Sequence, residues 1–293
     1  MKLNRFALTL AMAVLAVGAI SASAQTNTVF AFKTLIYPGD TFTQTLGINN
    51  AGTIAGYHNG NVNSGFVLTL PKTFVTENYP KAVQTQVIGI NNNGKTAGFY
   101  VDAAGTNHGF VDTNGSFSTY DYPGTTFNQL LGLNDGGTGV GYYQDAEGND
   151  HAYSTKNHKF TLLGASGVSS QATGIDNAGD IVGFYIDTAG INHGFLLIGS
   201  TYTTLDFPQS TFTQALGINN LQEVVGTYTD AAGNTHGFLY DITTAVFEPV
   251  NEPNGVDSTL INGINDNGQI VGFYVDSIGN TDGFIGTIVR CNP

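Results

Sequence analysis

The sequence predicts an all-β fold, a six-bladed β-propeller with four-stranded antiparallel blades. First, a triplet of the Gly-Ile-Asn type returns six times, at steps of 42 to 46 residues, and repeats of this length are typical of propeller blades. Second, 39 glycines, 19 Phe and 14 Tyr with only 11% charged residues favour turns and strands over long helices. Third, the repeats do not begin and end with the chain, because the first and last repeats are each incomplete. The triplets begin at Gly47, Gly89, Gly132, Gly174, Gly217 and Gly263.

Each repeat contains four short segments with strand-like composition. Examples of the four are TQALGIN (213–219), IVGFY (181–185), HGFLL (193–197) and YTTLDF (202–207). The first and second are joined by an Asn-x-x-Gly turn, and the second and third by an Asp-x-x-Gly turn. Both patterns fit a type I turn that ends in a left-handed glycine, a common hairpin connection. An aromatic-Pro pair follows most fourth strands, where proline ends the ladder.

The phase offset predicts how the ring closes. Residues 29–40 form a fourth strand with no first three before it, and residues 281–289 form a third strand with no fourth after it. We therefore expect the N-terminal strand to complete the last blade. An open β-solenoid, which needs capping repeats, or a sandwich is the alternative.

The N-terminal segment predicts export. Lys2 and Arg5 precede the apolar stretch 6–20, and a small-x-small site ends at Ala24. We expect residues 1–24 to be a signal peptide and residues 25–293 to be a single propeller domain, secreted to the periplasm or outside the cell. A membrane anchor at the N-terminus is the alternative, and the mature chain contains no later apolar run long enough to span a bilayer.

Charge and cysteine content restrict the partners. The formal net charge of −13 disfavours nucleic acid, which is bound by arrays of Lys and Arg. The lone Cys291 can form no intrachain disulfide and has no ligand spacing. The turns between the first two strands are mostly Asn rather than carboxylates, so we predict no metal site and no cofactor there.

The repeat GINNNGKTAGFYVDAAGTNHGF (89–110) and its copies resemble the HAF repeat of bacterial extracellular repeat proteins. The resemblance covers most of the mature chain. It implies export and a β-rich repeat fold, and it implies no catalytic residues.

Aligning the repeats yields columns of equivalent residues. The isoleucine of the triplet and the aromatic of His-Gly-Phe are apolar in every repeat, so we expect both in the core. The glycine of the triplet is expected where inner strands crowd near the axis. An Asp and a His six residues apart, such as Asp102 and His108, recur in several repeats. Copied around a ring, they are expected to hold hairpins together, and a ring of acid and imidazole is the alternative.

A polar column supplies the candidate binding site. A glutamine stands three residues before the triplet in five repeats, preceded by a hydroxyl or amide residue. The first strand of a propeller blade is innermost, so both columns are expected at the channel mouth, where neutral polar groups suit hydrogen bonding to a neutral ligand. The alternative is that the glutamine side chains bond one another or the backbone around the axis. The glutamines are Gln44, Gln86, Gln129, Gln171 and Gln214.

The function predicted is a secreted, non-enzymatic binding or interaction module, for a neutral glycan or another protein at the channel mouth. A purely structural envelope protein is one alternative. A hydrolase or lyase over the channel is another, with Glu248, Glu252 or Asp257 of the irregular connection between the last two blades as its carboxylates. Glu252 and Asp257 are also candidate ligand-binding residues. No nucleophile elbow, zinc motif or phosphate loop occurs, so no catalytic residue is assigned.

Overall fold

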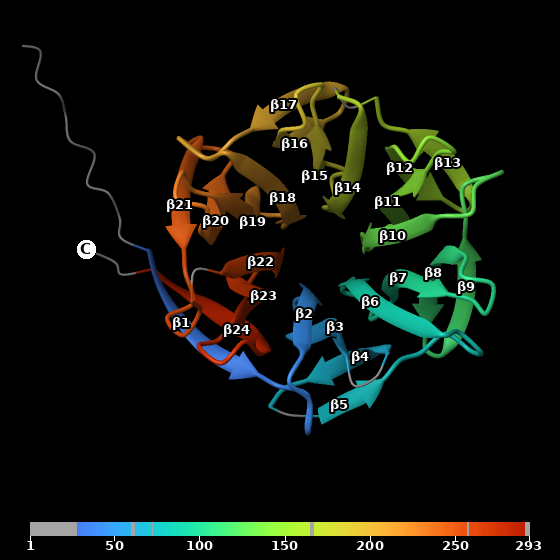
Figure 1. The fold of residues 1–293 in the computed structure, drawn as a ribbon, viewed down its shortest axis with the longest axis horizontal. Helices are drawn as coiled ribbons and strands as arrows, with labels where there is room; N and C mark the ends of the chain where they lie inside the picture. Colours follow the sequence, from blue (N-terminus) through green and yellow to red (C-terminus); the bar gives the residue numbers. More distant parts are fainter. Residues whose placement is uncertain (1–27, 60–61, 72, 165–166, 257, 291–293) are drawn as a thin grey trace, which may run out of the picture.

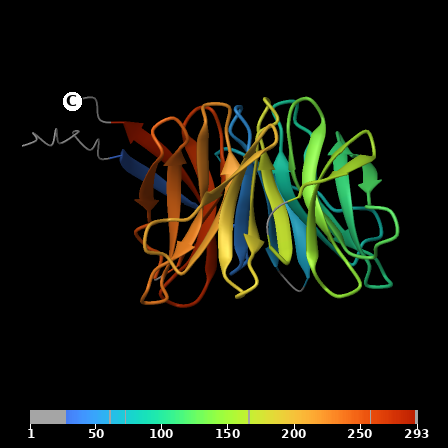
Figure 2. The same cartoon turned by 90° about the horizontal axis from the view of Figure 1, so that it is seen from above.

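The computed structural model confirms the six-bladed propeller. Six four-stranded antiparallel sheets surround a central axis, as Figure 1 shows. Seen from the side, the strands run between two loop-covered faces (Figure 2). The predicted signal peptide lies outside the described part of the chain. The structure describes residues 28–59, 62–71, 73–164, 167–256 and 258–290.

The innermost strand of each blade carries the Gly-Ile-Asn triplet at its end. These strands are β2 (Thr43–Ile48), β6 (Gln84–Ile90), β10 (Asn128–Leu133), β14 (Ser169–Ile175), β18 (Phe212–Ile218) and β22 (Thr259–Ile264). The second strand pairs with it across the Asn-x-x-Gly turn. The second strands are β3 (Thr53–Asn59), β7 (Thr96–Val101), β11 (Thr138–Gln144), β15 (Ile181–Ile186), β19 (Glu223–Thr229) and β23 (Gln269–Val275).

The third strand carries the His-Gly-Phe motif. The third strands are β4 (Asn63–Thr69), β8 (Asn107–Thr113), β12 (Asp150–Lys156), β16 (Asn192–Ile198), β20 (Thr235–Asp241) and β24 (Thr281–Arg290). The fourth strand is outermost and the most exposed. The fourth strands are β5 (Thr73–Thr76), β9 (Ser116–Tyr120), β13 (Lys159–Leu162), β17 (Thr201–Leu205), β21 (Val246–Val250) and β1 (Thr28–Leu35).

The N-terminal strand closes the ring, as the phase offset predicts. β1 pairs antiparallel with β24, from Thr28 opposite Arg290 to Leu35 opposite Gly283, so the last sheet has the order β1-β24-β23-β22. The blue N-terminal strand therefore lies against the red C-terminal strand in Figure 1. Both ends of the chain therefore contribute to one blade, which completes the ring.

The core lies between the blades. The aromatic of His-Gly-Phe is no more than 1% exposed in all six blades, which confirms its assignment to the core. The triplet isoleucine column, by contrast, is buried around the axis and lines the central cavity rather than only the blade interfaces. No helix among the described residues is long and apolar enough to cross a membrane.

Antiparallel order places the connections on two faces. The Asn-x-x-Gly turns and the turns from third to fourth strand lie on one, which we call the asparagine face. The Asp-x-x-Gly turns and the connections between blades lie on the other, the glutamine face. In the turn after β2, Asn49 Oδ1 accepts the backbone N–H groups of Ala51 and Thr53, and Gly52 adopts a left-handed φ of 77°.

Candidate functional site

A β-bulge in every inner strand shapes the central channel. In β2, the register with β3 shifts between Thr45 and Gly47, so Leu46 lies unpaired and projects toward the axis. Gly47 follows because a Cβ there would lie 2.6 Å from the carbonyl oxygen of Ile88 on the next blade. Neighbouring inner strands thus approach too closely for any side chain at this position, which confirms the role predicted for the triplet glycine.

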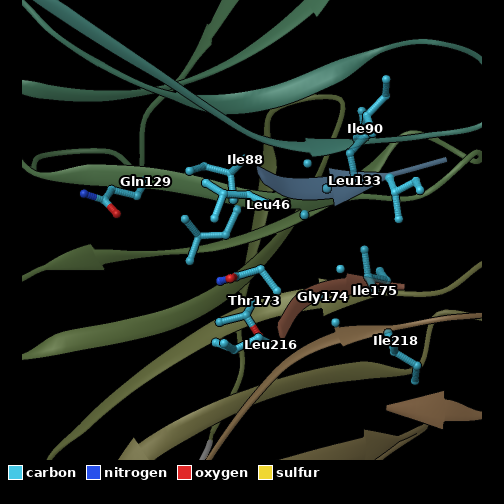
Figure 3. A pocket seen from close by; sticks show the side chains of 18 of the residues that line it. Leu46, Ile88, Ile90, Gln129, Leu133, Thr173, Gly174, Ile175, Leu216 and Ile218 are labelled. Atoms are coloured by element: carbon cyan, nitrogen blue, oxygen red, sulfur yellow. The ribbon is translucent and has the colours of Figure 1, made fainter. Parts of the chain in front are cut away.

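The channel has a volume of about 460 Å³ and is lined in layers along the strands. Figure 3 shows three of them, with Gln129 at the left, Leu46, Ile88, Thr173 and Leu216 in the middle, and the isoleucine column at the right. The outer layer is the glutamine ring, Gln44, Gln86, Gln129, Gln171 and Gln214. The middle layer, which we call the collar, is formed by the bulged residues Leu46, Ile88, Leu131, Thr173, Leu216 and Asn262. The inner layer is Ile48, Ile90, Leu133, Ile175, Ile218 and Ile264.

Beyond the inner layer, two rings of hydrogen bonds border the mouth at the asparagine face, and they surround a cavity of only about 80 Å³. In the first ring, each Asn side chain donates to the backbone carbonyl of the next blade, as Asn91 Nδ2 does to Asn134 O at 3.0 Å. The ring is interrupted once, because the carboxylate of Asp176 has no proton to donate to Asn219. Its members are buried. They are Asn49, Asn91, Asn134, Asp176, Asn219 and Asn265.

The second ring is complete. Each backbone N–H donates to the side-chain Oδ1 of the next blade, at 2.7 to 2.9 Å, through all six blades. Burial alone would raise the pKa of Asp135, but hydrogen bonds from Asn92 and Asn177 outweigh it and leave that pKa lowered. The side-chain amides and carboxylates at this mouth are therefore already hydrogen-bonded to neighbouring blades. The members are Asn50, Asn92, Asp135, Asn177, Asn220 and Asp266.

The mouth at the glutamine face differs, because its amides are only partly paired. Gln171 Nε2 donates to Asp150 Oδ2 at 2.6 Å, and Gln214 Nε2 donates to Asn192 Oδ1 at 3.2 Å. No hydrogen-bond partner for the side chains of Gln44, Gln86 or Gln129 exists among the described residues. The structure thus brings all five predicted glutamines to one mouth, and the predicted alternative, that their side chains bond one another or the backbone around the axis, is not observed among the described residues.

The hydroxyl and amide column next to the glutamines was wrongly expected at the mouth. Strand side chains alternate between faces, so this column points away from the axis into the blade. In four blades its members accept the backbone N–H of the aromatic residue in the aromatic-Pro pair, as Thr43 Oγ1 does from Tyr37 and Thr85 Oγ1 does from Tyr79. All six members are buried.

Glu252 does not line the channel. It occupies the position of the aromatic in the aromatic-Pro pair and is 3% exposed. Its carboxylate accepts the backbone N–H and side-chain amide of Asn254, at 2.5 and 3.0 Å. Glu248 lies in the outer strand β21. Asp257 lies outside the described residues. The two carboxylates that the structure describes are therefore not brought together over the channel.

The Asp and His pairs form hydrogen bonds within their own hairpins, as expected. His108 Nε2 lies 3.4 Å from Asp102 Oδ2, and its Nδ1 lies 2.7 Å from Asp121 Oδ2 on the adjoining connection. Backbone N–H donation from Thr106, together with His108, lowers the pKa of Asp102. The imidazole thereby ties the hairpin to the end of the outer strand, and its ring stacks on Tyr100 at 4.9 Å.

The chemical groups of the lining are almost all neutral. The described residues that line the channel include no carboxylate, imidazole, amine or guanidinium. Tyr57 is the single titratable one, and burial raises its pKa to about 12, so its hydroxyl is protonated at neutral pH. The Thr173 hydroxyl donates to the carbonyls of Ala215 and Val182, at 2.8 and 3.2 Å. The described lining residues can donate and accept hydrogen bonds, and the Asp150 carboxylate accepts a hydrogen bond from Gln171 from outside the lining.

Sequence reasoning missed the collar. Its residues stand immediately before each triplet glycine, a column that is aliphatic in four repeats and polar in two. Each stands two residues after a glutamine position, so alternation along the strand directs both columns to the same side. The bulge at this column was not anticipated. The signal was present, since an invariant glycine next to an apolar column is what a bulge requires.

Comparison with known proteins shows the fold. No protein-family model matches the chain, and no curated protein sequence does. TolB from Acinetobacter baumannii is similar in structure with a TM-score of 0.57 and 11% identity, over 81% of this chain and 65% of TolB. Virginiamycin B lyase from Staphylococcus aureus has a TM-score of 0.52 and 10% identity, over 89% and 100%. A chain of a nidogen/laminin complex has a TM-score of 0.51 and 12% identity, over 75% and 84%.

Proposed function

We propose that this protein is an exported, non-enzymatic binding propeller that takes a neutral glycan at the glutamine mouth of its channel. The observation that carries the proposal is the difference between the mouths. The amides at the asparagine face are paired around a cavity of only about 80 Å³, whereas Gln44, Gln86 and Gln129 have no partner among the described residues, beside a cavity of about 460 Å³. Unpaired amides beside a cavity offer hydrogen bonds that a hydroxyl-rich ligand can complete.

The dimensions and composition of the channel support this ligand class. A volume of about 460 Å³ lies within the range of small-molecule sites. Tyr57 and Phe99 pair with Gln44 and Gln86 across the hairpins and also line the channel, so apolar ring edges stand beside the amides. The neutral lining suits a ligand without charge.

The names of the structural neighbours record two uses of this architecture, a lyase for virginiamycin B and a complex of nidogen with laminin. For this chain, the neutral polar and aliphatic lining supports binding of an uncharged ligand. Export rests on the N-terminal sequence. The resemblance of the repeats to HAF repeats agrees with it.

A thermal-shift screen of the purified protein against neutral mono- and oligosaccharides tests the proposal. A glycan present at 100 times its Kd should stabilise the protein by about 2.7 kcal/mol. Calorimetry should then give saturable binding, and chromatography of the recovered glycan should show no cleavage. Absence of a shift with every neutral glycan, or turnover of a bound one, would contradict the proposal.

A further inference from the structure

The glutamine ring is divided into two halves. Gln171 and Gln214, on the fourth and fifth blades, are held from outside by Asp150 and Asn192. The sixth blade has Leu260 at this position, and it does not line the channel. The free amides therefore all belong to three consecutive blades, the first to the third. They are Gln44, Gln86 and Gln129.

The collar is divided along the same line. On the first three blades it is formed by Leu46, Ile88 and Leu131, directly below the free glutamines. On the other three it is formed by Thr173, Leu216 and Asn262, two of which are polar. Asn262 Oδ1 is buried without a hydrogen-bond partner, so this side of the collar already carries an unsatisfied polar atom. One half of the channel wall is thus amide above and aliphatic below.

We propose that the ligand is an amphipathic neutral glycoside, whose sugar binds the free glutamines and whose alkyl or acyl chain enters the collar against Leu46, Ile88 and Leu131. This inference rests on the proposed function and adds the chemistry of the ligand's second part. A sugar alone satisfies the amides but leaves the aliphatic collar in contact with water. An apolar chain removes that surface from water, which is favourable in proportion to the area covered.

The channel also limits the length of the chain. Gln44 pairs with Tyr57 and Ile48 pairs with Ile54, three residues further along the regular strand β3, so at about 3.3 Å per residue the inner layer lies roughly 10 Å below the glutamines. Below that layer the two asparagine rings leave a cavity of only about 80 Å³. The affinity should therefore rise with chain length and then stop rising when the end of the chain reaches the inner layer.

Calorimetric titration with alkyl glycosides tests the proposal. Methyl, butyl, hexyl and octyl β-glycosides of glucose, galactose and N-acetylglucosamine would be used, each below its micelle concentration. For the sugar that binds, each methylene buried in the collar should tighten binding about fourfold. An affinity that does not depend on chain length would overturn the inference and leave the proposed function standing. Absence of binding by every member would overturn both.

Matched variants locate the contacts. Q44A/Q86A/Q129A should weaken binding of the octyl glycoside at least tenfold, whereas Q171A/Q214A should leave it within a factor of two. L131N copies into the third blade the residue that the sixth blade already carries, and should abolish the gain from chain length. L216N is its control on the opposite side. Equal losses in both halves would contradict the one-sided footprint, and unchanged melting temperatures would show that each variant folds.

Discussion

The two mouths of the channel use almost the same side chain with opposite results. At the asparagine face, amides and carboxylates of adjacent blades exchange hydrogen bonds around the axis. At the glutamine face, Gln44, Gln86 and Gln129 have no side-chain partner among the residues that the structure describes. The difference lies in placement, because the asparagines stand in tight turns that hold them against the next blade, whereas the glutamines stand at strand starts, on the open channel. A repeated polar residue stabilises the ring where it meets its own copy, and is free for a ligand where it does not.

The largest expected effect comes from removing one side-chain amide from the first ring at the asparagine face. Asn91 is 4% exposed, donates to Asn134 O and accepts the N–H groups of Asn93 and Lys95. Asn91→Ala leaves these three groups without their side-chain partner and should lower the free energy of unfolding by about 3 kcal/mol. Gln86→Ala, on the strand β6 that leads into this turn, should change it by less than about 0.5 kcal/mol. Urea denaturation measures both, and similar losses in the two variants would refute the distinction between the mouths.

A second test asks whether unpaired polar groups are tolerated away from water. Glu77 lies between the first two blades, at the position that Leu35, Leu205 and Val250 occupy in three other blades. Its carboxyl group accepts a hydrogen bond from the Thr96 hydroxyl and lies near Asp112. Asp112 is 6% exposed and its Oδ1 has no partner. Burial, with a smaller contribution from Asp112, raises the pKa of Glu77 to about 7. Glu77 should therefore be largely protonated in the folded protein below neutral pH.

The sign of the pH effect follows from this shift. The folded state binds the Glu77 proton more tightly than the unfolded state, so its contribution is complete below pH 4.5 and is lost as the pH rises to about 7. We expect a loss of about 2 kcal/mol in unfolding free energy across this window. Glu77→Gln, which keeps a neutral hydrogen-bonding group, should remove most of that slope in urea titrations at pH 5 and pH 8. An unchanged slope would locate the titration elsewhere.

A third, smaller effect concerns the carboxylates of the second ring. Asp135 Oδ2 accepts the side-chain amides of Asn92 and Asn177, at 2.9 and 2.7 Å. Asp135→Asn replaces one acceptor oxygen by a donor that faces these two donors, and should cost about 1 kcal/mol at neutral pH. Because the folded pKa of Asp135 is lowered, its contribution is present above the ordinary value and lost as the pH falls through the folded one. The variant should therefore be closest to the parent protein at low pH, and a gap that grows on acidification would contradict this role.

The sequence was sufficient for the fold and for the position of the glutamines, because both follow from periodicity. The spacing of the triplets fixes the blades, and Gln86 and its copies face the axis because alternation along the inner strand directs them there. Pairing could not be predicted in this way. Gln171 and Gln129 are equivalent in the repeat, yet only Gln171 meets a carboxylate, since Asp150 stands where other blades have Asn or Thr. The collar stands two residues after the glutamines and faces the axis by the same alternation, but the bulge that leaves it unpaired was not predicted. A site made by differences between repeats therefore needs coordinates.

The gap in the first ring offers the finest test of the comparison. Asp176 accepts the backbone N–H groups of Gly179 and Asp180, as its equivalents accept theirs, but it cannot donate to the Asn219 carbonyl. Burial, with a smaller contribution from the neighbouring Asp176, raises the pKa of Asp180.

Asp176→Asn supplies the missing donor and removes the nearby charge. It should raise the free energy of unfolding by about 0.5 kcal/mol and lower the pKa of Asp180 toward its ordinary value. Chemical denaturation and carboxyl NMR titration measure the two effects, with Gln171→Glu as a change of opposite charge at the other mouth. A destabilised Asp176→Asn protein would mean that the ring tolerates its interruption for a reason other than the lack of a donor.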